Sequence, residues 1–268
     1  MKIFLHGLRK IDYIILFCLP IISVLISVKF TVPYLFSIFL FYALPGIYLS
    51  FRYGHVWQVN KGLIFAILVA TPFAIIVDFI GTQSGLWYVP NTLFSQRFLG
   101  IIPWEDFVWM IIATYTMVII YETLFDKSKR ELIDKRMWYF CSSAFLVLGS
   151  FFLLLIFGNP QWFAFKNEYT YLILGTVFFL LPAILFTAKF PKFIKKSLPL
   201  MGYFLYLTLL FEITATFLTQ WTFGGTYIFP TLNIFGNTPI PFEELFFVGF
   251  IGPLAAIAFY EFFDDNRK

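Results

Sequence analysis

Charged side chains are scarce in this chain. Asp, Glu, Lys and Arg together make up 13% of its 268 residues, whereas soluble proteins carry about 25%. Apolar residues reach 60%, and the mean hydropathy is +0.83. So little charge excludes an ordinary soluble domain and indicates an integral membrane protein.

Residues that hold metals and cofactors are also few. Both cysteines, Cys18 and Cys141, fall inside apolar stretches, which favours packing over a disulfide or a metal site. No Gly-x-Gly-x-x-Gly follows a predicted strand, so a dinucleotide fold is excluded. There is no histidine cluster for iron, no Asp-rich pair for magnesium diphosphate and no lysine in the last apolar stretch for a retinal Schiff base. We therefore expect no cofactor and no metal, and acid–base chemistry is what remains.

Long apolar stretches are what the chain has instead. A helix of about 20 residues crosses a bilayer, and we identify eight stretches of that order: 11–28, 33–51, 62–81, 104–124, 137–157, 168–189, 198–219 and 242–262. They predict an all-α fold, a polytopic bundle of about eight transmembrane helices. The first stretch contains Pro20 and lacks a small-residue cleavage pattern, which favours a retained helix over a signal peptide.

Lys and Arg residues lie mostly on one side of these predicted spans. Sixteen lie on the side that holds both termini, and only Lys29, Arg97 and Lys166 lie on the other. The bias predicts that both termini are in the cytoplasm, with the protein in the cell (inner) membrane. The net charge of +4 therefore reflects topology and does not indicate a nucleic-acid partner.

One acidic motif occurs twice. Pro103-Trp104-Glu105-Asp106 opens the fourth predicted span, and Pro241-Phe242-Glu243-Glu244 opens the eighth, at an offset of 138. Other residues match at offsets of 134 or 137: Asp78, Thr82 and Trp87 with Glu212, Thr216 and Trp221, and Leu44-Pro45 with Leu181-Pro182. We interpret the chain as two parallel membrane repeats, residues 1–130 and 131–268, in one integrated bundle with an axis along the membrane normal.

The paired acids have two interpretations. A proline at the first helical position followed by acids is an ordinary helix start. However, the pairs recur, and Asp78 and Glu212 add an acid to each matching span, with Thr82 and Thr216 one turn further along. Burial without a neighbouring cation favours the protonated acid, and adjacent carboxyls can share a proton. Such a site can donate a proton and take one back.

On these residues the chain resembles the lycopene cyclases of the heterodimeric type, in which two small membrane subunits or their fusion act together. The repeated Pro-x-Glu-Glu/Asp motif and the acid–Thr–Trp run before it carry the resemblance, over residues 34–126 and 169–264. The first copy departs from the pattern, because Asp106 replaces the second Glu. The resemblance implies a redox-neutral cyclisation of the ψ end groups of lycopene to β-type rings through a carbocation, with a lipid-soluble carotenoid as substrate.

We expect Glu105 and Glu243 to be the principal acid–base residues, with Asp106 and Glu244 as tuning or proton-recycling partners. Glu243→Gln should then abolish ring formation. A second tier of catalytic or supporting residues comprises Asp78, Glu212, Thr82, Thr216, Trp87 and Trp221.

Two other functions fit the same residues. Intramembrane acids near a two-fold axis also suit a proton-coupled membrane transporter. Water could capture the same carbocation, which would make the protein a carotenoid hydratase. Ring type, the number of ends closed, substrate length and a homo-oligomeric state stay open.

Overall fold

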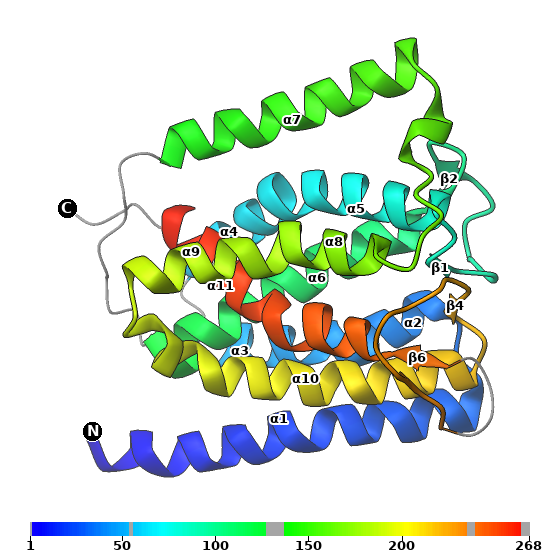
Figure 1. Ribbon diagram of the computed structural model, residues 1–268. Helices are drawn as coiled ribbons and strands as arrows, with labels where there is room; N and C mark the ends of the chain where they lie inside the picture. Colours follow the sequence, from blue (N-terminus) through cyan, green and yellow to red (C-terminus); the bar gives the residue numbers. More distant parts are fainter. Residues whose placement is uncertain (1, 54–55, 127–136, 235–238, 264–268) are drawn as a thin grey trace.

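The chain forms a bundle of long helices with short strands at one end. The computed structural model describes residues 2–53, 56–126, 137–234 and 239–263 (Figure 1). It is 76% helical, which confirms the predicted all-α helical bundle. We refer to the end of the bundle that carries the strands as the hairpin end.

Seven helical stretches are long and apolar enough to cross a membrane, so this is an integral membrane protein. They span Lys10–Phe30, Tyr34–Tyr53, Val59–Gln83, Trp104–Phe125, Thr170–Lys189, Phe193–Phe217 and Glu244–Glu261. Each coincides with a predicted span. The remaining predicted span, 137–157, is helix α7 (Met137–Phe157), which also runs along the bundle (Figure 1). Because its described apolar part is only Phe145–Phe157, an eighth crossing stays a prediction.

The two halves have the same order of long helices but differ in their π-helical segments. In the first half the elements are α1 (Lys2–Phe30), α2 (Tyr34–Ile38), η1 (Phe39–Ala43), α3 (Leu44–Tyr53), α4 (Val56–Phe65), η2 (Ala66–Ala70), α5 (Thr71–Gln83), α6 (Trp104–Ile120) and η3 (Tyr121–Asp126). In the second they are α7, the 3-10 turn η4 (Pro160–Phe163), α8 (Thr170–Gly175), η5 (Thr176–Leu180), α9 (Leu181–Lys189), α10 (Phe193–Phe217), η6 (Glu244–Ile251) and α11 (Gly252–Phe263).

Four prolines inside these helices follow π-helical segments. Segments η1, η2, η5 and η6 each end two residues before a proline, namely Pro45, Pro72, Pro182 and Pro253. Proline has no N–H to donate and its ring clashes with the preceding turn, and the wider π turn relieves that crowding. The spans therefore continue through their prolines.

Three two-stranded ladders close the hairpin end. Strands β2 (Arg97–Phe98) and β3 (Ile102–Pro103) form one antiparallel hairpin, and β5 (Thr231–Leu232) and β6 (Ile240–Pro241) form the other. Each hairpin leads directly into a helix that begins with the acidic motif. The hairpins therefore fix where both acid pairs enter the bundle.

The third ladder joins the two halves. Strand β1 (Trp87–Tyr88) pairs antiparallel with β4 (Thr222–Phe223), and Tyr88 lies opposite Thr222. These two positions match at the offset of 134, so matching residues face each other. This is the pairing that a two-fold axis between the halves would produce.

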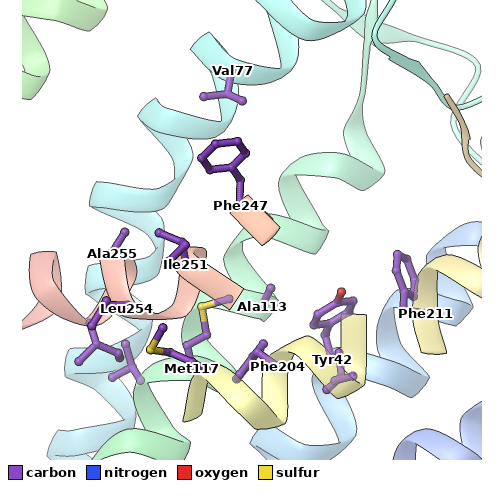
Figure 2. Close-up of a cluster of buried hydrophobic side chains, with 14 of the residues drawn as sticks. Tyr42, Val77, Ala113, Met117, Phe204, Phe211, Phe247, Ile251, Leu254 and Ala255 are labelled. Carbon is purple, nitrogen blue, oxygen red and sulfur yellow. The ribbon is translucent and has the colours of Figure 1, made fainter. Parts of the chain in front are cut away.

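The core lies between α6 and α11, the helices that continue from the two acid motifs. They pack on each other, α10 packs on η6 and α11, and α5 packs on α6. Figure 2 shows part of this core, with the buried side chains of Met117, Phe204, Ile251 and Leu254. Large apolar side chains on the outer faces, such as Phe51 and Phe157, are exposed, as a hydrocarbon surrounding allows.

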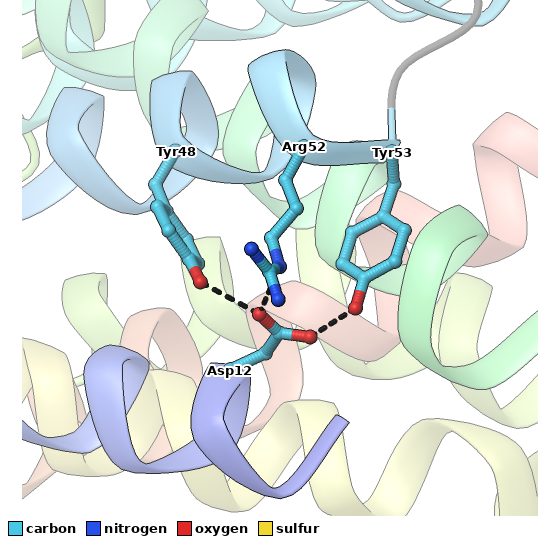
Figure 3. Close-up of polar contacts among 4 residues, drawn as sticks. All are labelled: Asp12, Tyr48, Arg52 and Tyr53. Carbon is cyan, nitrogen blue, oxygen red and sulfur yellow. Dashed lines mark hydrogen bonds and ion pairs between the residues drawn. The ribbon is translucent and has the colours of Figure 1, made fainter. Parts of the chain in front are cut away.

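An ion pair with a buried carboxylate links α1 to α3. Asp12 is 0% exposed; its Oδ1 lies 2.5 Å from Arg52 Nε and accepts the Tyr48 hydroxyl at 2.6 Å. Tyr53 donates to Oδ2, so both oxygens of the carboxylate are bound (Figure 3). We call these four residues the Asp12 clamp.

Candidate active site

A cavity near the hairpin end brings acids from both halves together. Asp78, on α5, and Glu244, at the start of η6, both line it. Its aromatic walls come from Trp87, Trp109, Tyr171 and Trp221, and Met110, Gly175, Phe179 and Val248 belong to its apolar lining. A ligand in this cavity would contact two carboxyl groups and otherwise apolar and aromatic surface.

Each second acid of the repeated motif accepts a tyrosine hydroxyl. Tyr34 donates to Asp106 Oδ1 at 3.0 Å, and Tyr171 donates to Glu244 Oε2. Tyr34 opens α2 and Tyr171 lies in the first turn of α8, so the two bonds are made by corresponding helices. Both tyrosines are buried. Each bond fixes the direction of one carboxyl group inside the bundle.

Four buried acids act on each other electrostatically across the two halves. Asp78 interacts with Asp106 and Glu244, and Glu212 interacts with Glu244. All four are at most 3% exposed. No Lys or Arg in the described part of the chain forms an ion pair with them. Four carboxyls without paired cations cannot all be ionised in such a setting, so protons must be held among them.

Three of these acids have an oxygen without a partner. Asp78 Oδ2, Asp106 Oδ2 and Glu212 Oε2 are buried and accept no hydrogen bond within the described residues. The predicted neighbours do not serve them: Thr216 Oγ1 donates to the backbone oxygen of Glu212 at 2.6 Å, and Thr82 is half-buried at the last turn of α5. The supporting role predicted for the two threonines is therefore limited to the helix backbone for Thr216.

The first acid of each motif binds a loop. Glu105 Oε1 accepts the N–H groups of Leu93 and Phe94 at 2.6 and 3.2 Å. Glu243 Oε1 accepts those of Ile228 and Phe229 at 2.8 and 2.9 Å. The four loop residues correspond at an offset of 135, so both halves make the same pair of bonds. Neither acid lines the cavity that holds Asp78 and Glu244.

Trp87 and Trp221 lie together at the centre of the hairpin end. Their rings stack at a centroid distance of 6.3 Å and an interplanar angle of 16°. Gly81 makes room for Trp87, because a Cβ on this glycine would lie 2.0 Å from the indole ring. Tyr171 meets Trp87 edge-on at 5.5 Å, and Trp109 lies 6.4 Å from Trp221. The predicted tryptophans thus form one wall of the cavity.

Arg97 is a cation that interacts electrostatically with an acid of the first half. Arg97 donates to the backbone oxygens of Val89 and Ile101 at 2.6 and 3.1 Å, lies over the Tyr88 ring, and interacts electrostatically with Asp106. Its position in the β5–β6 hairpin is taken by Thr231, which pairs with Pro241 as Arg97 pairs with Pro103. Asp106 and Glu244 therefore lie in different electrostatic surroundings.

Sequence reasoning missed Tyr34, Tyr171 and Trp109. A signal for the tyrosines was present, because they match at 137, the same offset as the Leu44-Pro45 and Leu181-Pro182 pairs. Trp109 has no such signal, since the matching position is Phe247.

Comparisons of the chain with protein-family models, curated proteins and solved structures give no match. Apart from the motif resemblance, it is therefore the geometry of the cavity that indicates a function.

Proposed function

We propose that the chain is a carotenoid cyclase that closes the ψ end groups of lycopene, or a related linear carotenoid, to β-type rings. The observation that carries the proposal is the pairing of Asp78 and Glu244, from opposite halves, in one cavity with apolar and aromatic walls. Proton donation by one carboxyl and proton removal by another is general acid–base catalysis, and it changes no oxidation state.

Glu244 is the acid in this proposal. Its proton forms a C–H bond at the terminal carbon–carbon double bond, and a tertiary carbocation results. The electron pair of a nearby double bond closes the ring and moves the cation into it. The Asp78 carboxylate then takes a proton from a carbon beside the cation, and the electrons of that C–H bond become the ring double bond. The product is an isomer of the substrate.

The surroundings support this division of roles. The Tyr171 hydroxyl donates to Glu244, so it stabilises the carboxylate that remains once the proton has left. The rings of Trp87, Trp109 and Trp221 line the cavity, and aromatic faces stabilise cations. After each turnover one proton has moved from Glu244 to Asp78, and it must return to Glu244 before the next ring can close.

These roles differ from those expected from the sequence, in which Glu105 and Glu243 are the principal acid–base residues. Glu105 and Glu243 are assigned to holding the loops that they bind. Asp106 and Glu212 are assigned an electrostatic role. Because Glu244 lines the cavity and Glu243 does not, it is the second acid of this motif that is available for chemistry there.

The test is expression in a bacterial host that accumulates lycopene, followed by chromatography of the carotenoids. We expect cyclic products with the wild type and unchanged lycopene with Glu244→Gln at an equal amount of membrane-inserted protein. Hydroxylated acyclic products would instead favour the hydratase, in which water captures the cation. Unchanged lycopene with the wild type would refute both.

A proton-coupled carrier is the second candidate, favoured by four buried acids without paired cations. A carrier would leave the carotenoids unchanged, so the same chromatogram separates it from a cyclase. In either case we propose an inner-membrane protein with both termini in the cytoplasm, as the distribution of Lys and Arg indicates. Reporter fusions at the two termini would test this orientation.

A further inference from the structure

The two halves fill their corresponding sites differently. At the cavity, the second half contributes Gly175 and the first half contributes Val77. The residues at the matching positions of the other site are Ile38, at the offset of 137, and Phe211, at the offset of 134. At one position a benzyl group thus replaces an isopropyl group. At the other, Ile38 stands where Gly175 leaves room for the Phe247 ring, which would lie 2.3 Å from a Cβ on this glycine.

These larger side chains pack tightly. Ile38 is 0% and Phe211 is 2% exposed. The Phe211 ring lies 5.1 Å from that of Tyr42 and 6.4 Å from that of Tyr34, the residue that donates to Asp106. Figure 2 shows Tyr42 beside Phe211. Phe211 therefore fills space next to Tyr34, the partner of Asp106. A cavity lined by Tyr42, Trp109 and Thr208 also lies on this side, but no acid lines it, whereas Asp78 and Glu244 line the cavity described above.

The cavity also continues into the bundle. Val77, Met110 and Phe179 line both the acid cavity and a second, apolar cavity that reaches Phe65 and Phe259. From Asp78 to Phe65 the helix path is thirteen residues, which at 1.5 Å per residue is about 20 Å. An extended hydrocarbon chain that presents its end to the acids would follow this path.

We propose that the duplicated fold carries a single substrate chamber, which admits one end of a linear polyene at a time. This rests on the function proposed above. Asp106 and Glu212 belong to a filled counterpart site and do not touch the substrate. A molecule with two identical ends must therefore leave after the first ring closes and bind again in the opposite direction for the second.

Matched substitutions test the chamber. Val77→Phe places the residue of the filled site into the cavity, and Phe211→Val makes the reverse change at the matching position. We would purify both variants and the wild type in detergent from lycopene-accumulating cells and measure bound polyene per chain by absorbance. We expect one polyene per chain for the wild type and Phe211→Val, and at least a tenfold loss for Val77→Phe.

Other binding ratios would overturn the chamber. For the wild type, these ratios are two polyenes per chain or none. For the variants, they are undiminished binding by Val77→Phe, or an equal loss of binding by Val77→Phe and Phe211→Val at equal folded protein. The binding ratio does not depend on ring formation. If the wild type forms no ring but binds one polyene that Val77→Phe loses, the proposed reaction fails and the single chamber stands.

The order of products tests the one-end-at-a-time mechanism. With lycopene in large excess over enzyme, we expect monocyclic product to appear free in the membrane before any bicyclic product. Bicyclic product formed in the first turnover, without a free monocyclic intermediate, would overturn release and rebinding.

Discussion

Buried carboxyl groups at the two ends of the bundle differ in their hydrogen-bond and ion-pair partners. Asp12 has Arg52, Tyr48 and Tyr53 on its two oxygens. Asp78 has a buried oxygen with no partner in the described structure, and Glu244 accepts one tyrosine hydroxyl beside a cavity. Both kinds of acid are almost fully buried. Burial therefore does not distinguish them, whereas the presence of a paired cation does.

The difference indicates what each acid is for. A carboxylate whose two oxygens are bound by a cation and two phenols is fixed in place and has a structural role. A carboxyl without a cation can exist with or without its proton, as acid–base catalysis requires. Four substitutions break or sharpen this contrast.

Glu244→Gln should have the largest effect on ring formation. The amide keeps the shape of the acid but cannot donate the proton, and loss of a general acid reduces rates by about 10²–10⁴-fold. Carotenoid chromatography at equal membrane-inserted protein measures it. Asp106→Asn, at the matching position, should retain at least about a tenth of the activity; an equal loss in both variants would place the acid in the wrong half.

Tyr171→Phe should slow ring formation by about tenfold. It removes the hydroxyl that donates to Glu244, and a hydrogen bond to a charged group contributes about 1.5–3 kcal/mol. Initial rates in isolated membranes are the measurement, with Tyr34→Phe as the matched control. If the Tyr34 variant loses more activity than the Tyr171 variant, the assignment of the reacting acid is wrong.

Glu243→Gln should retain ring formation to within about threefold. Its amide oxygen can still accept the N–H groups of Ile228 and Phe229. The sequence alone predicted that this variant is inactive, so the two views are directly opposed. Glu243→Leu, which has no acceptor, should lose folded protein. Complete inactivity of the Gln variant at normal folded protein would restore Glu243 as the catalytic acid.

Asp12→Asn should have the smallest effect on the chemistry. It removes the charge that pairs with Arg52, whose side chain is 29% exposed, so solvent screening keeps the expected loss of stability small. A thermal unfolding scan in detergent would show a lower midpoint, with ring formation per folded molecule unchanged. A large loss of specific activity would mean that the clamp participates in the reaction.

The membrane helices could be predicted from the sequence, because hydropathy alone identifies them. Runs of about 20 apolar residues produced spans that coincide with the seven observed membrane helices. The acids around the site were also found, since Asp78 and Glu212 repeat with the Pro-acid motif. Periodic and repeated features of this kind are local properties of the chain.

The rest depended on contacts between distant segments. Nothing near Asp12 in the sequence indicates Arg52, which lies 40 residues later. The loop N–H groups that bind Glu105 come from the segment before its hairpin, and their geometry decides that this acid is not at the cavity. The difference between Val77 and Phe211 is visible in the sequence, but its meaning requires knowing that Val77 lines the cavity of Asp78 and Glu244.

The ladder between β1 and β4 has a consequence for assembly. Because Tyr88 faces its counterpart Thr222, each half presents the other with a strand edge of the right direction and register, and the stacked Trp87 and Trp221 lie beside it. We therefore expect residues 1–130 and 131–268, expressed as separate chains, to associate in the membrane. Their covalent joining would then act chiefly by raising effective concentration.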